Sequence, residues 1–182
     1  LKKINILVFI IGFSISSFGK NPLSTNKVQP NDTLDEYAQK NFVRNDDYTY
    51  NKNIKSVQFY NTSNIMSYPI ITLGDPNKLK LSFDDFSLEL KYYHYTIIHC
   101  NANWEKSDLR QNQYLANNYE DDIKNYKYSL NTDNQFIHYS IELPNEFISP
   151  IISGNYILKV YDGYDTEKVI ITKRFMVAEN KV

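Results

Sequence analysis

The feature that most constrains the fold is an alternation of apolar and polar residues with a period of two. Leu79, Leu81 and Phe83 are separated by polar residues, and the apolar residues of 137–143 are spaced in the same way. Successive side chains of a strand point to opposite faces, so this pattern predicts strands with one buried and one solvated face. The predicted strands are 54–60, 67–72, 79–84, 91–99, 126–130, 137–143, 155–161 and 168–177.

The spacing of these segments predicts an all-β fold, a two-sheet antiparallel sandwich of immunoglobulin-like type. Turn residues separate the strands, as in Gly74-Asp75-Pro76 and in 143–145. The last two predicted strands form a hairpin around Asp162-Gly163. Residues 101–125 lose the alternation and are interpreted as a long polar connection with a helical turn near 107–116. In 126–130, the alternation predicts that Tyr126, Tyr128 and Leu130 lie on the buried face.

Length and charge narrow the class of protein further. The chain has 182 residues, of which 42% are hydrophobic, enough for one domain with an N-terminal extension. Its formal net charge of −1 argues against a nucleic-acid binder, which would carry a basic surface. The 16 tyrosines favour strands over a helical bundle, because Tyr combines β propensity with a polar tip.

Residues 1–19 have the pattern of a signal peptide. Lys2 and Lys3 precede an apolar run that ends near Phe18, and the small residues Ser17 and Gly19 suit cleavage before Lys20. A membrane anchor is the alternative, but a spanning helix needs about 20 apolar residues and this run is shorter. We therefore predict an exported protein without a direct membrane span.

Residues 20–53 are polar, and we interpret them as a flexible leader before a β-sandwich domain at 54–182. Thr33 and Glu36 fit a capping box, so a short helix near 34–41 is an alternative within the leader.

The densest cluster of chemically reactive side chains lies at the end of the predicted strand 91–99. It consists of His99, Cys100, Asn101, Asn103 and Trp104, with His94 nearby. Neighbouring strand residues face opposite ways, so His99 and Cys100 cannot pair, and His94 lies about 20 Å from Cys100 along a strand. Cys100 is the only cysteine, so we predict a buried structural thiol and no intrachain disulfide.

Other catalytic arrangements are also missing from the sequence. No motif matches a zinc site, a calcium loop or a phosphate-binding glycine loop, so we predict no metal, no cofactor and no enzymatic activity. Carboxylates distant in sequence leave an exported hydrolase open. Trp104 with Tyr92, Tyr93 and Tyr95 leaves a sugar-stacking platform open, against a core aromatic at a strand end. That platform motivates the second hypothesis, a carbohydrate-binding or adhesin-like module.

Residues 92–104 read Tyr-Tyr-His-Tyr-Thr-Ile-Ile-His-Cys-Asn-Ala-Asn-Trp, and with them the chain resembles a known family. The resemblance is to the N-terminal domain of the plug protein of the bacterial type IX secretion system, and it runs from about residue 54 to residue 182. Further matching blocks occur in order at 54–60, 67–70, 79–85, 107–109, 138–139, 143–145, 153–161 and 174–177.

The resemblance implies a periplasmic protein at the inner side of the outer membrane. Its partner would be the translocon barrel, whose pore it seals sterically when no cargo is engaged. It implies no catalytic residues and no small-molecule substrate, and it leaves the interface residues unknown. The motif residues His99 to Trp104 are then interpreted as structural. Proteins of the family continue beyond the end of this domain.

Overall fold

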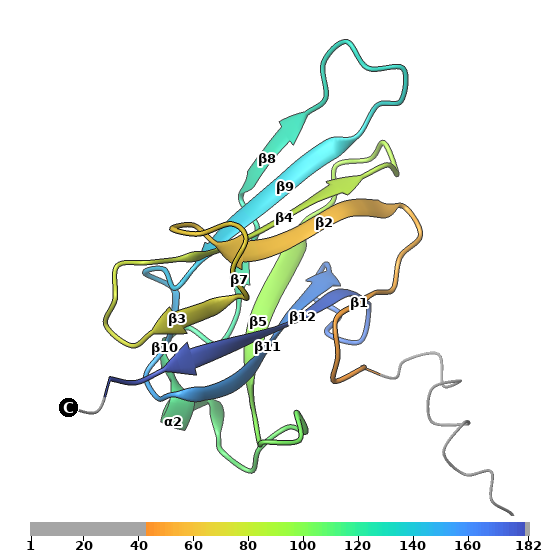
Figure 1. The fold of residues 1–182 in the computed structure, drawn as a ribbon. Coiled ribbons are helices and arrows are strands. Elements are labelled where there is room, and N and C mark those ends of the chain that lie inside the picture. Colours follow the sequence, from red (N-terminus) through yellow and green to blue (C-terminus); the bar gives the residue numbers. More distant parts are fainter. Residues whose placement is uncertain (1–42, 181–182) are drawn as a thin grey trace, which may run out of the picture.

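The computed structural model describes residues 43–180, in which two sheets stack face to face as a β-sandwich (Figure 1). The smaller sheet is antiparallel, with the order β2 (Ile54–Asn61), β4 (Leu79–Asp85), β9 (Ile137–Leu143) and β8 (Asn125–Tyr128). The larger sheet has the order β1 (Tyr48–Thr49), β12 (Val169–Ala178), β11 (Gly154–Asp162), β5 (Tyr93–Cys100) and β7 (Asp121–Asp122). β3 (Ile70–Thr72) joins this sheet parallel to β12. The predicted all-β sandwich is confirmed.

All eight predicted strands are present, and the hairpin of β11 and β12 pairs in antiparallel register. The predicted helical turn is the four-residue helix α2 (Gln111–Tyr114). Four short strands were not predicted: β1, β7, β6 (Leu115–Asn117) and β10 (Ile148–Pro150), of which the last two form a separate ribbon. Strands of two or three residues are too short to show an alternating pattern, so their sequence carries no signal.

Residues that precede the predicted start of the domain at residue 54 also belong to the larger sheet. Tyr48 and Thr49 pair with Thr172 and Ile171 of β12. The hydroxyl of Thr172 donates to the carbonyl of Asp46 at 2.8 Å. Backbone pairing fixes this segment, and a polar sequence does not reveal it. The signal peptide, residues 20–42 and the alternative helix at 34–41 lie outside the described residues.

The prediction that one face of β8 is buried is wrong. Tyr126 and Tyr128 are exposed, and Leu130 just beyond the strand is 83% exposed. β8 is an edge strand of the smaller sheet, and the hairpin that follows it projects away from the sandwich at the top of Figure 1. An alternating pattern predicts which side chains share a face of the strand. It does not show whether another sheet covers that face, and no sheet of the described chain covers it at the edge strand β8.

The core between the sheets is rich in aromatic rings. Phe83 of β4 and Tyr139 of β9 stack with centroids 5.3 Å apart, and Tyr93 of the opposite sheet meets both edge-on. Phe59 of β2 contacts Phe175 of β12 at 6.0 Å in the same edge-on geometry. Such pairs add attraction to the burial of apolar area, so they hold the two sheets in one relative orientation.

A fully buried carboxylate, that of Asp85, lies at the end of β4 and connects the sheets. It accepts a hydrogen bond from the hydroxyl of Tyr93 on β5 at 2.7 Å. It also accepts the backbone N–H and the hydroxyl of Ser87, each at 2.8 Å, and the ammonium group of Lys91 lies 3.9 Å away. A buried charge is tolerated only when it is paired and hydrogen-bonded, and Asp85 meets that condition.

We predict that Asp85→Ala lowers the free energy of unfolding by about 2–4 kcal/mol, because it leaves the Tyr93 hydroxyl buried without an acceptor. Equilibrium urea unfolding of Asp85→Ala, Tyr93→Phe and the double variant measures the coupling of the two groups. We expect the double variant to be more stable than the sum of the single effects implies, by about 1–3 kcal/mol. Strictly additive effects would contradict a direct link between the sheets.

Alkaline pH should destabilise the domain through its buried tyrosines. Burial raises the pKa of Tyr95 and of Tyr139 to about 12, and it raises the pKa of Tyr93 further. The unfolded chain, with ordinary phenol pKa values near 10, therefore releases protons before the folded chain does. Stability is then fully present below pH 10 and is lost as the pH rises towards 12.

Ultraviolet titration of phenolate, followed together with circular dichroism, checks this expectation. The buried tyrosines Tyr93, Tyr95 and Tyr139 should form phenolate only as the β signal disappears. A single ionisation near pH 10 with an intact β signal would show that the tyrosines are not buried.

Candidate docking surface

The motif at the end of β5 divides its side chains between the two faces of the larger sheet. His99 lies on the face that packs into the sandwich, between Tyr114 and Tyr156 at centroid distances of 5.7 and 5.1 Å. Its Nδ1 lies 2.8 Å from the hydroxyl oxygen of Ser107. Burial lowers the pKa of His99, so its ring is neutral at pH 7. A Cβ on Gly154 would lie 2.5 Å from this ring, so only glycine fits beside it.

Cys100 is buried on the opposite face, as the sequence predicts. Its Sγ donates to the carbonyl of Ile98 at 3.7 Å, and burial raises the pKa of the thiol to about 11. The other two histidines are engaged elsewhere. His94 lies 2.7 Å from Asp122, and His138 lies 2.7 Å from Asp84 on the smaller sheet. The arrangement brings no histidine to the thiol.

Asn101 shapes the loop that follows. Its Oδ1 accepts the backbone N–H groups of Asn103 and Glu105 at 2.9 and 3.1 Å, and its Nδ2 donates to the Glu105 carboxylate at 3.1 Å. These bonds close a tight turn, and Asn103 contributes its backbone to it. The turn places Trp104 in the left-handed region, with φ of 67°, and directs it back over the larger sheet.

Trp104 is half-buried at the surface and is not a core aromatic. The guanidinium carbon of Arg174 lies 4.6 Å from the ring centroid, a cation–π contact. The sugar-stacking platform proposed from sequence does not form, because Tyr93 and Tyr95 are buried in the core and only Tyr92 is exposed. Strand alternation separates these residues, and the aromatic-rich sequence alone does not show which of them reach the surface.

A notch of about 280 Å³ lies beside Trp104, at an interruption in the edge of β12. β1 pairs with the edge at residues 171–172 and β3 at 176–178. Between them the N–H of Arg174 donates to the Asp47 carboxylate at 2.8 Å, and the N–H of Met176 donates to the carbonyl of Pro69. Between these two pairings no strand within residues 43–180 covers the edge of β12. The notch there is lined mainly by apolar residues: Tyr68, Pro69, Trp104, Phe175 and Met176.

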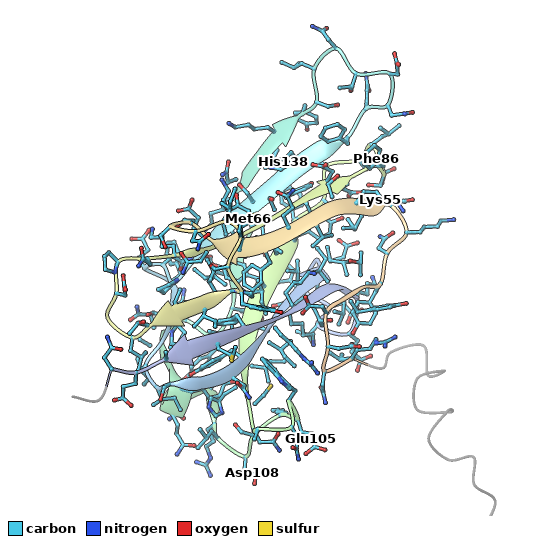
Figure 2. All side chains as sticks on the ribbon, in the orientation of Figure 1. Lys55, Met66, Phe86, Glu105, Asp108 and His138 are labelled. Carbon is cyan, nitrogen blue, oxygen red and sulfur yellow. The ribbon has the colours of Figure 1, made fainter. Side chains whose placement is uncertain are left out.

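Large apolar side chains extend from this notch along the loop between β2 and β3, which Met66 marks in Figure 2. Ile65 is 66% exposed, Met66 90% and Tyr68 80%. A hollow of about 440 Å³ lies beside Ile65 and Met66. We call Ile65, Met66, Tyr68, Trp104 and Met176 the Tyr68 patch. Clustered exposed apolar side chains of this kind mark surfaces that contact other proteins.

Of the residues in this patch, only Trp104 belongs to the candidate cluster at the end of the predicted strand 91–99. The signal for the others is weak: apolar residues scattered through the loop 62–69, which has no period and is rich in Ser, Thr and Asn. Among residues 43–180 no group of His, Cys, Asp or Glu is arranged to hold a metal ion. Nor does any helix in that range have the length and apolar character needed to cross a bilayer.

Comparison with known families decides the assignment. Residues 54–179 match the model of the type 9 secretion system plug protein 1st domain. The chain belongs to this family.

One solved structure shares the fold of this chain. A crystal structure of a hypothetical protein from Parabacteroides merdae ATCC 43184 has a TM-score of 0.71 and 30% sequence identity. The similarity covers 74% of this chain but only 34% of that protein, so the plug-family chain spans about a third of its relative's length. Pseudomonas fluorescens alkylpurine DNA glycosylase AlkC, at a TM-score of 0.36 and 12% identity over 69% of this chain and 30% of that one, is too distant to inform function. A search among curated proteins gives no match.

We predict that Cys100 reacts with a thiol reagent on the order of a hundredfold more slowly in the folded protein than in guanidinium, since the thiol is buried and protonated. An Asp133→Cys variant in a Cys100→Ala background provides an exposed control, because residue 133 lies in the exposed hairpin after β8. Labelling of native Cys100 at the rate of that control would show that the 101–106 loop opens readily.

Proposed function

We propose that this plug-family protein is a periplasmic component of the type IX secretion system that docks on the outer-membrane translocon barrel and seals its pore when no cargo is engaged. The observation that carries the proposal is the family match over residues 54–179. The signal-peptide pattern of residues 1–19 supports export to the compartment where such docking takes place.

The role is mechanical and non-enzymatic. Occluding a pore requires a body that keeps its shape and a surface that attaches reversibly. The aromatic core and the buried Asp85 give the sandwich a defined shape. His99 and Cys100 face opposite sides of the sheet and serve its packing. A rigid body with a docking surface needs no cofactor and no substrate for this role.

The Tyr68 patch is the part of the described surface best suited to the barrel contact. Its exposed aromatic and methionine side chains are residue types enriched in protein interfaces. Arg174 beside Trp104 adds a cation to the apolar surface. Trp, Tyr and Arg are enriched among the interface residues that contribute most of the binding energy. The patch lies on one edge of the sandwich, so docking through it leaves the broad faces of both sheets free to block the lumen.

Co-purification from cells tests the proposal. We expect the tagged chain, joined to the region that follows this domain in longer relatives, to retain the barrel in gentle detergent. We expect Met66→Ser combined with Tyr68→Ser to lower the recovered barrel at least about fivefold, because truncating interface anchors costs most of the binding energy. Tyr128→Ser with Leu130→Ser is the matched control, since it also removes two exposed apolar residues, on the opposite sheet.

Two results would count against the proposal in different ways. Absence of the barrel from every preparation would reject docking itself. Equal recovery with both double variants would reject the Tyr68 patch as the docking face. Cells that lack the protein should also take up a normally excluded solute, and an unchanged outer-membrane permeability would reject pore sealing.

A further inference from the structure

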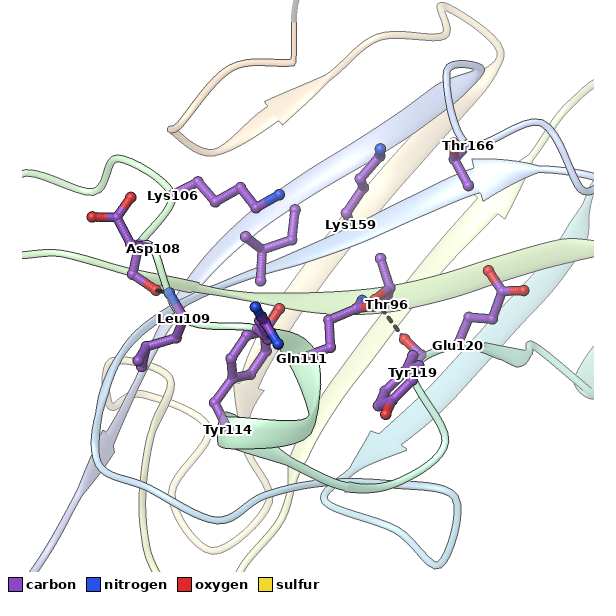
Figure 3. A pocket seen from close by; sticks show the side chains of 13 residues that line it. Thr96, Lys106, Asp108, Leu109, Gln111, Tyr114, Tyr119, Glu120, Lys159 and Thr166 are labelled. Atoms are coloured by element: carbon purple, nitrogen blue, oxygen red, sulfur yellow. Dashed lines mark hydrogen bonds between the residues drawn. The ribbon is translucent and has the colours of Figure 1, made fainter.

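A cleft of about 780 Å³ lies apart from the Tyr68 patch (Figure 3). Thr96 and Ile98 of β5 and Lys159 of β11 form part of its wall. The connection that follows β5 forms the rest, from Lys106 to Glu120. The carbonyl of Tyr119 accepts the Thr96 hydroxyl at 2.6 Å, and the carbonyl of His99 accepts the N–H of Ser107 at 3.0 Å. These bonds hold the connection against the edge of β5, so the cleft is a formed feature of the fold.

Two lysines from different elements line this cleft. In Figure 3 the side chain of Lys106 extends over the sheet toward Lys159, whose own side chain rises from β11 toward Thr166. Within residues 43–180, neither ammonium group takes part in an ion pair or a hydrogen bond. Lys159 is half-buried, and its contact with the Tyr161 ring is a long one of 5.9 Å.

The surroundings of Lys159 disfavour its charge. Burial is the main cause that lowers the pKa of Lys159, the charge of Glu167 opposes this effect, and the nearby charge of Lys106 adds a smaller lowering. A sheltered ammonium group beside a like charge is stabilised by an anion that comes between them.

The acidic residues around the cleft restrict which anion fits. Asp108 and Glu120 line the cleft on either side of the lysines in Figure 3. Arg110 also lines the cleft and adds a third cation. Glu120 accepts the Tyr161 hydroxyl, so its position is fixed. A membrane surface or a nucleic acid presents many negative charges, and these would meet Asp108 and Glu120. A single carboxylate flanked by uncharged groups would not, and Tyr114 and Leu109 offer it apolar surroundings.

We propose that this cleft binds an acidic side chain of a protein partner, with the carboxylate held between Lys106 and Lys159. The inference stands independently of the proposed plug function, because it rests on the cleft alone. The ligand is one glutamate or aspartate within an otherwise uncharged segment, since flanking acids would be repelled by Asp108 and Glu120.

Nuclear magnetic resonance titration of the chain tests the site, with acetyl-Ala-Glu-Ala-amide as probe and the glutamine peptide as its uncharged match. We expect saturable shifts at Thr96, Lys106 and Lys159 with the glutamate peptide only. Lys159→Met should weaken this binding by about fivefold or more, because the carboxylate loses a charged partner in a sheltered site. Lys106→Gln provides a second variant, so the test does not depend on one fold-sensitive position.

Lys127→Met is the control variant, because Lys127 is an exposed lysine on β8 of the other sheet and its removal changes the net charge equally. It should leave the affinity unchanged. Equal responses to the two peptides, or equal losses in Lys127→Met and Lys159→Met, would overturn the proposal. So would tighter binding of inorganic phosphate, or of anionic vesicles, through the same two lysines.

Discussion

The carboxylate of Asp85, buried where the two sheets meet, is the constraint on which the rest of the sandwich depends. Its burial is stabilised by the hydrogen bond from the Tyr93 hydroxyl on β5, together with the two hydrogen bonds from Ser87. The aromatic pairs of Phe83, Tyr93 and Tyr139 surround this bond and fix the rotation of the sheets. Apolar contacts alone would tolerate small slips, whereas a single hydrogen-bonded charge permits one register.

That fixed register gives β5 its two roles. Its inward side chains, including Tyr93 and Tyr95, complete the core, while Cys100 faces outward beneath the loop that positions Trp104. Thr96 and Ile98 of the same strand form part of the wall of the cleft that contains Lys106 and Lys159. The sequence around β5 therefore contributes to two surfaces with different chemistry, through Trp104 to the apolar one and through Thr96, Ile98 and Lys106 to the basic one. Neither surface requires side chains that react.

Sequence patterns predicted the strands that bury one face, since alternation records burial directly. They also predicted the burial of Cys100, because one-residue spacing determines which face a strand residue takes. They failed where structure depends on the backbone or on context: β1 pairs through polar residues, and Tyr128 faces solvent on an overhanging edge. The Tyr68 patch combines segments 65–68, 104 and 176, which come together only through β12 and its neighbours. Lys106 and Lys159 are likewise unrelated in sequence.

The order of strands in the larger sheet has a consequence for the life of the chain before it folds. β12 is the last strand of this domain along the described chain, yet it lies between β1 and β11 and also pairs with β3. The bond from Thr172 to Asp46 spans 126 residues. The early strands β1 and β3 therefore have no sheet to join until the final segment is available. Contacts so distant in sequence form slowly. The larger sheet of this domain can therefore close only after β12 is available to its neighbours on both sides.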